Sequence, residues 1–148
     1  MDSGTVLNWG MDWAWGIPFI VVTIVFHAFG LGLINKKITS KLDASRWFRH
    51  PSASSVLVMG GTALWATLLH GFESCLWAGA YRFLGALPDN RVAVLYSLSA
   101  MTSYGHENVQ LAGKWQLMSS LEALSGWILF GLTAAFLFTT MQKAWPRD

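Results

Sequence analysis

The residues best equipped for chemistry lie in one polar turn, Thr102-Ser103-Tyr104-Gly105-His106-Glu107-Asn108. The apolar run before this turn, Val92 to Met101, belongs to a helix of only about 12 residues, which is too short to cross a bilayer. Irregular backbone at membrane depth is tolerated only where protein buries it or where it lines a water-filled cavity. A short helix that leads into such a turn, between two long apolar segments, predicts a re-entrant pore loop. Its chemistry would be the passage of ions.

Other ionisable side chains lie within the long apolar segments. His70 and Glu73 are three residues apart and therefore share one helix face. As a metal pair they would need further ligands, and the sequence offers no third ligand near them. We therefore favour a polar pair that supports the pore helix. His27 lies in the middle of the first apolar segment, where a neutral histidine bonded to a neighbouring helix is favoured over a proton-sensitive site.

Glu122 is an acid inside the last apolar segment. A carboxyl group at this depth is costly and needs a partner. The candidate partners are Ser97, Ser99, Tyr104 and His70. We expect Glu122 to anchor the filter loop from behind rather than to bind an ion.

The composition sets the class of protein. Of the 148 residues, 53% are hydrophobic and only 12% are charged. A soluble domain carries about 25% charged residues, so this chain is expected to lie in a membrane. The net charge of +2 is too small to indicate nucleic-acid binding, and no pattern calls for a cofactor. The single Cys75 excludes an internal disulfide.

Three long apolar segments and the short one divide the chain into two parts. Residues 1–54 are predicted to hold a first transmembrane helix at 17–34, followed by a basic loop. The predicted pore module, residues 55–148, consists of an outer helix 55–85, a pore helix 91–101, a filter loop 102–115 and an inner helix 116–144.

The basic residues predict the orientation in the membrane. Residues 35–54 hold five of the ten lysines and arginines, and Lys143 and Arg147 follow the last apolar segment. Because cytoplasmic loops are enriched in such residues, both regions are expected to be cytoplasmic and the N-terminus outside. The two basic regions lie on the same side only if the segment 92–101 does not cross.

Two stretches resemble a known family. LYSLSAMTSYGHENV, followed by KWQLMSSLEALSGWILFGLTAAFLF, is similar to the pore module of the two-transmembrane ion-channel superfamily, and specifically to its small bacterial potassium-channel-like members. The family filter, T-T-x-G-Y-G-D, falls on residues 102–108. The inner-helix pattern W-x-L-x-x-x-E-A-x-x-G falls on Trp115, Leu117, Glu122, Ala123 and Gly126. The resemblance covers about residues 60–142 and implies a homotetramer.

The same resemblance gives Gly126 a role as the hinge at which the inner helix bends to gate the pore. The alternative is a close helix contact at this glycine, and Gly131 with Ala134 and Ala135 could also form that contact.

The filter departs most from the family pattern at its last three positions. The family's tyrosine, second glycine and aspartate are replaced by His106, Glu107 and Asn108. A potassium filter exposes a ladder of backbone carbonyls in which alternate residues take positive φ, and Glu at such a position costs about 1 kcal/mol or more. A fourfold ring of Glu107 carboxylates favours cations in general. With His106 beside it, the ring predicts conduction that depends on external pH.

These features together predict an all-α membrane protein with three transmembrane helices, a re-entrant pore helix and a filter loop. It is expected to form a cation channel in the cell membrane, the bacterial inner membrane, with lipids and copies of itself as its partners. It is not expected to be an enzyme. One alternative is a non-conducting scaffold or sensor that keeps the pore-module fold and binds a partner through residues 35–54. Another is a membrane metalloenzyme that uses His70, Glu73, His106 and Glu107.

Overall fold

The computed structural model describes residues 3–44, 51–105, 109, 111 and 115–145. All regular elements within these ranges are α-helices. The helices are α1 (Ser3–Ala44), α2 (Pro51–Phe83), α3 (Asn90–Met101) and α4 (Gln116–Ala144).

Three of the four helices are long enough and apolar enough to cross a membrane. The apolar segments are Gly10–Ile38, Ser55–Phe83 and Gln116–Ala144, each of 29 residues. At 1.5 Å per residue each extends about 44 Å, which exceeds the roughly 30 Å of the hydrocarbon core. The structure therefore contains the three long apolar helices that the sequence predicts. Each could cross a membrane, as in a multi-pass membrane protein.

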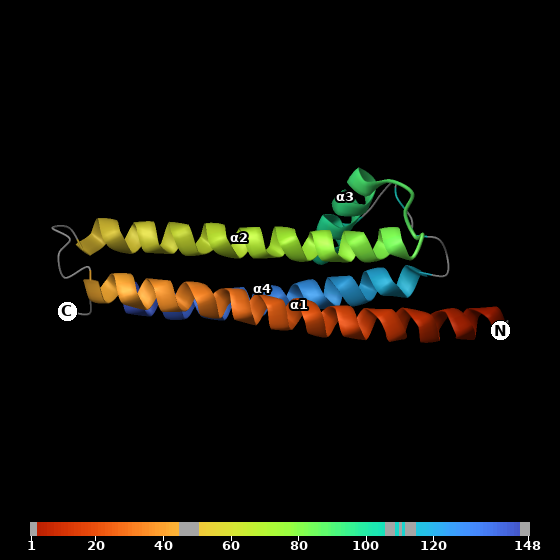
Figure 1. Cartoon of the computed structure of the whole chain (residues 1–148), viewed down its shortest axis with the longest axis horizontal. Coiled ribbons are helices and arrows are strands. Elements are labelled where there is room, and N and C mark those ends of the chain that lie inside the picture. The colour runs from red at the N-terminus through yellow and green to blue at the C-terminus, as the bar shows by residue number, and fades with distance from the viewer. Residues whose placement is uncertain (1–2, 45–50, 106–108, 110, 112–114, 146–148) are drawn as a thin grey trace.

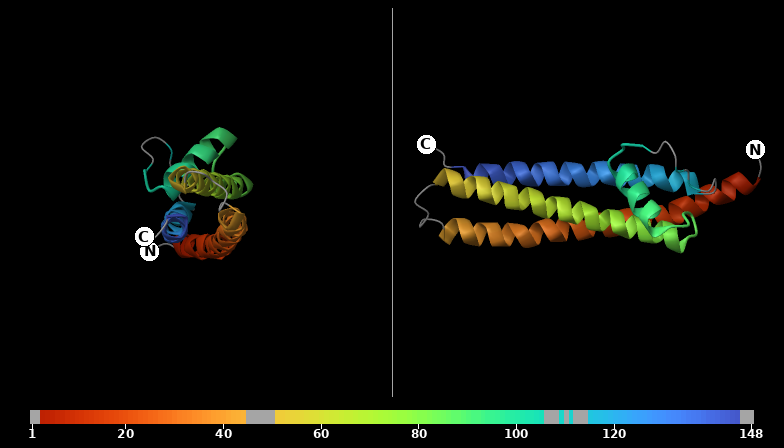
Figure 2. Two further views of the ribbon diagram at one scale, coloured as in Figure 1. Left: turned by 90° about the vertical axis from the view of Figure 1, so that its left-hand side faces the viewer. Right: turned by 90° about the horizontal axis from the view of Figure 1, so that it is seen from above.

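The long helices lie side by side, and α3 stands beside α2 near one end of the bundle (Figures 1 and 2). In Figure 1 the C-terminal ends of α1 and α4 share one end of the bundle with the start of α2. The chain enters α4 from the end at which it leaves α2. Consequently α3 does not traverse the bundle, and the two basic regions flank the same end, in accordance with the arrangement expected from the sequence.

The first helix is longer than the sequence indicated. The predicted span 17–34 lies inside the 42-residue helix α1, so the segment before it is a helical continuation rather than a separate surface stretch. Packing explains the extension: an added Cβ on Gly16 would lie 2.4 Å from a methyl group of Leu121 in α4. The Trp15 ring meets Phe83 of α2 edge-on at 6.1 Å. These contacts hold the polar N-terminal turns of α1 against the bundle.

The turn between α2 and α3 fixes where the short helix begins. Gly85, with φ +64°, ends α2 slightly before the predicted boundary at residue 85, since glycine takes this conformation without a steric penalty. The Asp89 side chain accepts hydrogen bonds from two backbone N–H groups of the first turn of α3, which caps the helix. Arg82 donates to the Leu87 carbonyl and to Asn90 Oδ1, each at 2.7 Å. The start of α3 is thereby tied to the end of α2.

The main apolar core lies where α2, α3 and α4 meet. Trp77 and Tyr81 of α2, Tyr96 of α3 and Met118 and Leu129 of α4 are all buried there. The rings of Tyr81 and Tyr96 meet edge-on with centroids 5.4 Å apart, a favourable aromatic geometry. This core is the platform on which α3 rests.

Candidate functional site

The C-terminal end of α3 leads directly into the predicted filter loop. Thr102 caps the helix in a helical conformation, and Ser103 and Gly105 then take positive φ, at 54° and 91°. Tyr104 lies between them with 89% of its surface exposed. The positive φ of Ser103 belongs to the end of α3, because the Ser103 and Tyr104 N–H groups bond back to the Ala100 and Ser99 carbonyls, as in the Schellman motif that ends many helices. His106, Glu107 and Asn108, which continue the predicted filter, lie outside the described residues.

The beginning of the loop is held on two sides. Trp127 of α4 donates from its indole N–H to Ser103 Oγ at 3.0 Å. The Tyr104 backbone N–H donates to the Ser99 carbonyl at 2.9 Å, and Thr102 Oγ1 donates to the Leu98 carbonyl at 2.8 Å. The loop therefore leaves α3 in a defined direction, anchored to both α3 and α4.

Glu122 anchors α3 from the α4 side. It is fully buried, and its carboxylate accepts hydrogen bonds from the Ser97 hydroxyl of α3 and, at 2.7 Å, from the Tyr81 hydroxyl of α2. Of the partners considered from the sequence, Ser97 is the one the structure provides. Ser99 bonds to its own helix, and Tyr104 faces outward. One carboxylate thus joins three helices.

Tyr81, which is completely buried, is a partner of Glu122 that the sequence analysis did not identify. A detectable signal existed: Tyr81 follows Glu73 and Trp77 at four-residue intervals, so it continues the same helix face. The packing of α3 against α2 and α4 covers that face.

Gly126 lies at the closest approach between α3 and α4. A Cβ at this position would lie 2.1 Å from the carbonyl oxygen of Met101, the last residue of α3. Only a residue without a side chain allows this contact. Gly131, the other candidate for a close contact, has open space around it within the single chain. A packing role therefore accounts for Gly126.

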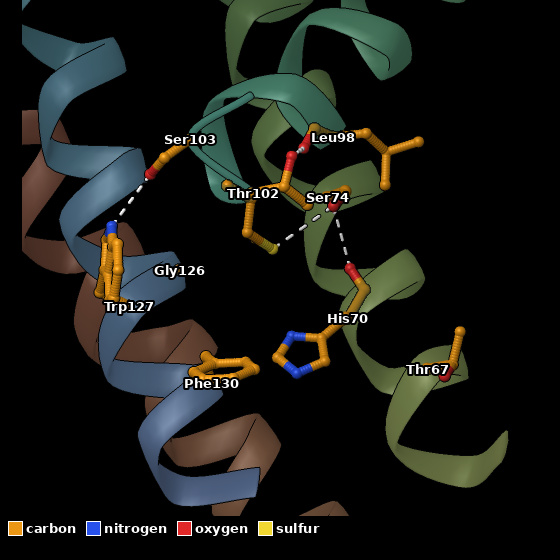
Figure 3. A pocket seen from close by; sticks show the side chains of 10 residues that line it. Thr67, His70, Ser74, Leu98, Thr102, Ser103, Gly126, Trp127 and Phe130 are labelled. Atoms are coloured by element: carbon orange, nitrogen blue, oxygen red, sulfur yellow. Dashed lines mark hydrogen bonds between the residues drawn. The ribbon is translucent and has the colours of Figure 1, made fainter. Parts of the chain in front are cut away.

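A mostly apolar cavity of about 440 Å³ opens below the loop, between α2 and α4 (Figure 3). It is lined by residues from three helices and from the loop: Thr67, His70, Ser74, Leu98, Met101, Thr102, Ser103, Gly126, Trp127 and Phe130. In Figure 3 the His70 imidazole points from α2 toward Phe130 of α4. The cavity is therefore bordered both by the start of the loop and by the ionisable side chain of His70.

A second polar cluster lies deeper in the bundle and joins all three long helices. His27 of α1 contacts Glu73 of α2 through Nδ1 (2.8 Å to Oε1) and Thr133 of α4 through Nε2 (2.9 Å to Oγ1). His70 of α2 contacts the same two residues: its Nε2 lies 3.1 Å from Thr133 Oγ1 and its Nδ1 lies 3.5 Å from Glu73 Oε2. The two imidazole centroids are 4.9 Å apart. We call these four residues the His–Glu–Thr ring.

The ring revises two readings of the sequence. The prediction that His27 bonds to neighbouring helices is confirmed. For His70 and Glu73 we expected contact with the pore helix, whereas their side-chain contacts run to α1 and α4. Spacing along the chain also indicated no third metal ligand, yet His27 brings one from 46 residues away. Sequence spacing detects neighbours on one helix, and this partner arrives through tertiary packing.

No protein-family model, curated protein or solved structure matches this chain.

Proposed function

We propose that this chain is the subunit of a cation channel, in which four copies surround a central pore and residues 102–108 form the constriction. The observation that carries the proposal is the short helix α3, which does not traverse the bundle and whose C-terminal end leads into the exposed residues 102–105. The resemblance of residues 60–142 to potassium-channel-like proteins agrees with it. Ion conduction requires no covalent bond to form or break.

The electrostatics of α3 support a cation as the transported species. The helix has 12 residues, about 18 Å at 1.5 Å per residue. Its C-terminal end, which carries the partial negative charge of the helix dipole, meets the loop at Thr102. A cation held in the loop would therefore be stabilised by the helix, while an anion would be repelled.

The outer surface of the single chain supports assembly. Leu95 of α3, Tyr104 of the loop and Trp127 and Phe130 of α4 expose between 64% and 89% of their surface close to the loop. Exposed apolar residues gathered near one site indicate an interaction surface. One copy cannot enclose a pore, and a closed symmetric oligomer would cover these side chains while bringing the loops together.

The selectivity is expected to differ from that of a potassium filter. Four Glu107 carboxylates around one axis would attract cations of several kinds, including divalent ions. The neighbouring His106 imidazoles change charge between about pH 5 and 8. We therefore propose a cation pore that responds to external pH.

Reversal potentials in liposomes with purified protein test this function. Glu107→Gln should lower the permeability to divalent cations several-fold relative to potassium, because the carboxylate ring is removed. Asp43→Asn is the matched control, since Asp43 lies in the last turn of α1 at the opposite end of the bundle, and it should leave the selectivity unchanged. A strictly potassium-selective current that is the same with and without Glu107 would rule out the carboxylate ring.

Absence of any flux at all pH values would favour the alternative, a membrane scaffold or sensor that retains the fold. A partner would then be sought among molecules that bind the basic segment 35–54.

A further inference from the structure

The His–Glu–Thr ring places a carboxylate and two imidazoles inside the helical bundle. His27 and Glu73 are completely buried, and His70 is half-buried at the wall of the cavity. A buried carboxylate is stable only when it is paired with a cation or is well hydrogen-bonded. The negative charge of Glu73 therefore needs a positively charged partner.

Counting hydrogens shows what the ring lacks. A neutral imidazole has one N–H and one lone pair, and a threonine hydroxyl has one O–H. One assignment of neutral tautomers satisfies the three short contacts: His27 Nδ1–H donates to Glu73 Oε1, Thr133 O–H donates to His27 Nε2, and His70 Nε2–H donates to Thr133 Oγ1, which uses all three hydrogens. The lone pair of His70 Nδ1 then faces Glu73 Oε2 at 3.5 Å with no hydrogen between them.

Glu73 Oε2 is the atom that remains unsatisfied. It is buried and accepts no hydrogen bond in the part of the chain that the structure describes. Two electron-pair donors that face each other across 3.5 Å, one of them negatively charged, are suited to hold a cation between them. The ring therefore lacks a positive charge between His70 Nδ1 and Glu73 Oε2.

We propose that a divalent transition-metal ion of the zinc class binds here, held by Nδ1 of His70, the Glu73 carboxylate and Nδ1 of His27. Ligand atoms of these three residues all lie within 4.8 Å of one another. Zinc binds imidazole nitrogen and carboxylate oxygen at about 2.0–2.2 Å in a tetrahedron, which separates two ligand atoms by about 3.3 Å. The 3.5 Å between His70 Nδ1 and Glu73 Oε2 is close to that separation.

Thr133 is suited to orient both imidazoles in the metal-bound state. With each Nδ1 on the metal, both rings carry their hydrogen on Nε2. The Thr133 oxygen has two lone pairs, so it accepts from His27 and from His70 at the observed 2.9 and 3.1 Å. Partners of this kind fix the tautomer and direction of histidine ligands.

The cavity supplies the route of entry. His70 lines it, so the edge of the site communicates with a space large enough for water (Figure 3). Three protein ligands leave one tetrahedral position free for a water molecule from that cavity. A bound ion would join α1, α2 and α4 at one point.

Metal titration of the purified full-length protein tests the site. After treatment with a chelator, the protein is titrated with Co²⁺, followed by visible absorption, and with Zn²⁺, followed by calorimetry. We expect one ion per chain and the intense absorption of tetrahedral Co²⁺. His70→Ala and Glu73→Gln should each weaken binding by about 100-fold or more, and Thr133→Val by about 10- to 100-fold.

Glu122→Gln is the matched control, because Glu122 is an equally buried glutamate whose partners are Tyr81 and Ser97. It should leave the metal affinity unchanged. Zn²⁺ should also raise the unfolding temperature of the parent and of Glu122→Gln, but not that of Glu73→Gln. His70 is half-buried beside a cavity, so His70→Ala serves as the second test if Glu73→Gln fails to fold.

The proposal is overturned if the parent binds no metal, or if Glu73→Gln and His70→Ala bind as tightly as Glu122→Gln. Either result would mean that a proton, rather than a metal ion, balances Glu73. The measurement is independent of ion conduction, so the channel proposal stands or fails separately.

Discussion

At the scale of single residues, two buried glutamates organise the polar interior. Glu122 of α4 accepts hydrogen bonds from α2 and α3, and Glu73 of α2 contacts α1 and α4 through two histidines. Neither glutamate is satisfied within its own helix. Both partners of Glu122 lie on other helices. Glu73 contacts His27 of α1 and His70 of its own helix, and Thr133 of α4 contacts both imidazoles, so each glutamate belongs to a cluster that joins three helices.

Removing a partner of Glu122 should destabilise the protein measurably. Tyr81→Phe and Ser97→Ala should each lower the free energy of unfolding by about 1–3 kcal/mol, since a buried acceptor loses a hydrogen bond. Ser99→Ala is the control on the same helix, because the Ser99 hydroxyl bonds to its own backbone. Its effect should stay within about 0.5 kcal/mol. Unfolding in detergent, followed by tryptophan fluorescence, gives these values, and equal losses for Ser97 and Ser99 would contradict the anchor.

At the scale of elements, the important feature is how α3 is fixed at both ends. Asp89 and Arg82 hold its beginning, and its end lies against Gly126 of α4. An element of 12 residues is only marginally stable as an isolated helix. The position of α3 therefore depends on these contacts and on the core beneath it. Because the loop begins at the end of α3, the same contacts fix where the loop begins.

Gly126→Ala should disturb the position of α3. The added methyl group would overlap the Met101 carbonyl, which belongs to the backbone and cannot turn aside, so we expect a loss of about 1–3 kcal/mol in the free energy of unfolding. Gly131→Ala on the same helix has open space and should be neutral or stabilising by about 1 kcal/mol. Unfolding in detergent compares the two variants.

The same pair of variants distinguishes packing from hinge bending. If Gly126 acted only as a hinge, its alanine variant would keep the stability of the parent and alter only the opening of the pore. A parental stability for Gly126→Ala would therefore contradict the packing account.

At the scale of the whole molecule, the orientation in the membrane follows from the helix order. The α2–α3 turn lies at one end of the bundle, and the C-terminal end of α4 lies at the other (Figure 1). The basic residues predict that the second end is cytoplasmic. Pro88 and Gln142 are exposed residues near the two ends.

Labelling of single cysteines checks this orientation. In a Cys75→Ser background, a membrane-impermeant maleimide added to intact cells should label Pro88→Cys strongly. It should label Gln142→Cys only after the membrane is opened. Equal labelling of both positions in intact cells would mean that the chain crosses an even number of times between them, with α3 as a further crossing.

The assembled state is tested by mass. The proposed pore predicts a particle of four chains of 16.4 kDa each, measured by native mass spectrometry after release from detergent. Trp127→Ala, at an exposed position near the loop, should weaken this assembly more than Phe138→Ala, which is exposed toward the far end of α4. A chain that remains monomeric under all conditions would contradict a pore of several copies.

Local sequence was sufficient for the elements themselves. The span 116–144 coincides with α4, and the pore helix 91–101 differs from α3 by one residue. Long apolar stretches, the Asp89 cap and Gly85 act within a few residues of themselves, so they can be recognised without knowing the fold. The exception is α1, which extends beyond the predicted span and packs at Trp15 and Gly16 on α2 and α4.

The sequence by itself determined an all-helical fold with three helices that are long and apolar enough to cross a membrane, a short fourth helix and ionisable side chains within apolar segments. Only the tertiary structure decided which of those side chains meet. His27 pairs with Thr133 across 106 residues, and Tyr81 pairs with Glu122 across 41. The physical reason is that hydropathy depends on local composition. Pairing depends instead on the rotation and axial offset of each helix, which close contacts such as those at Gly16, Gly30 and Gly126 set.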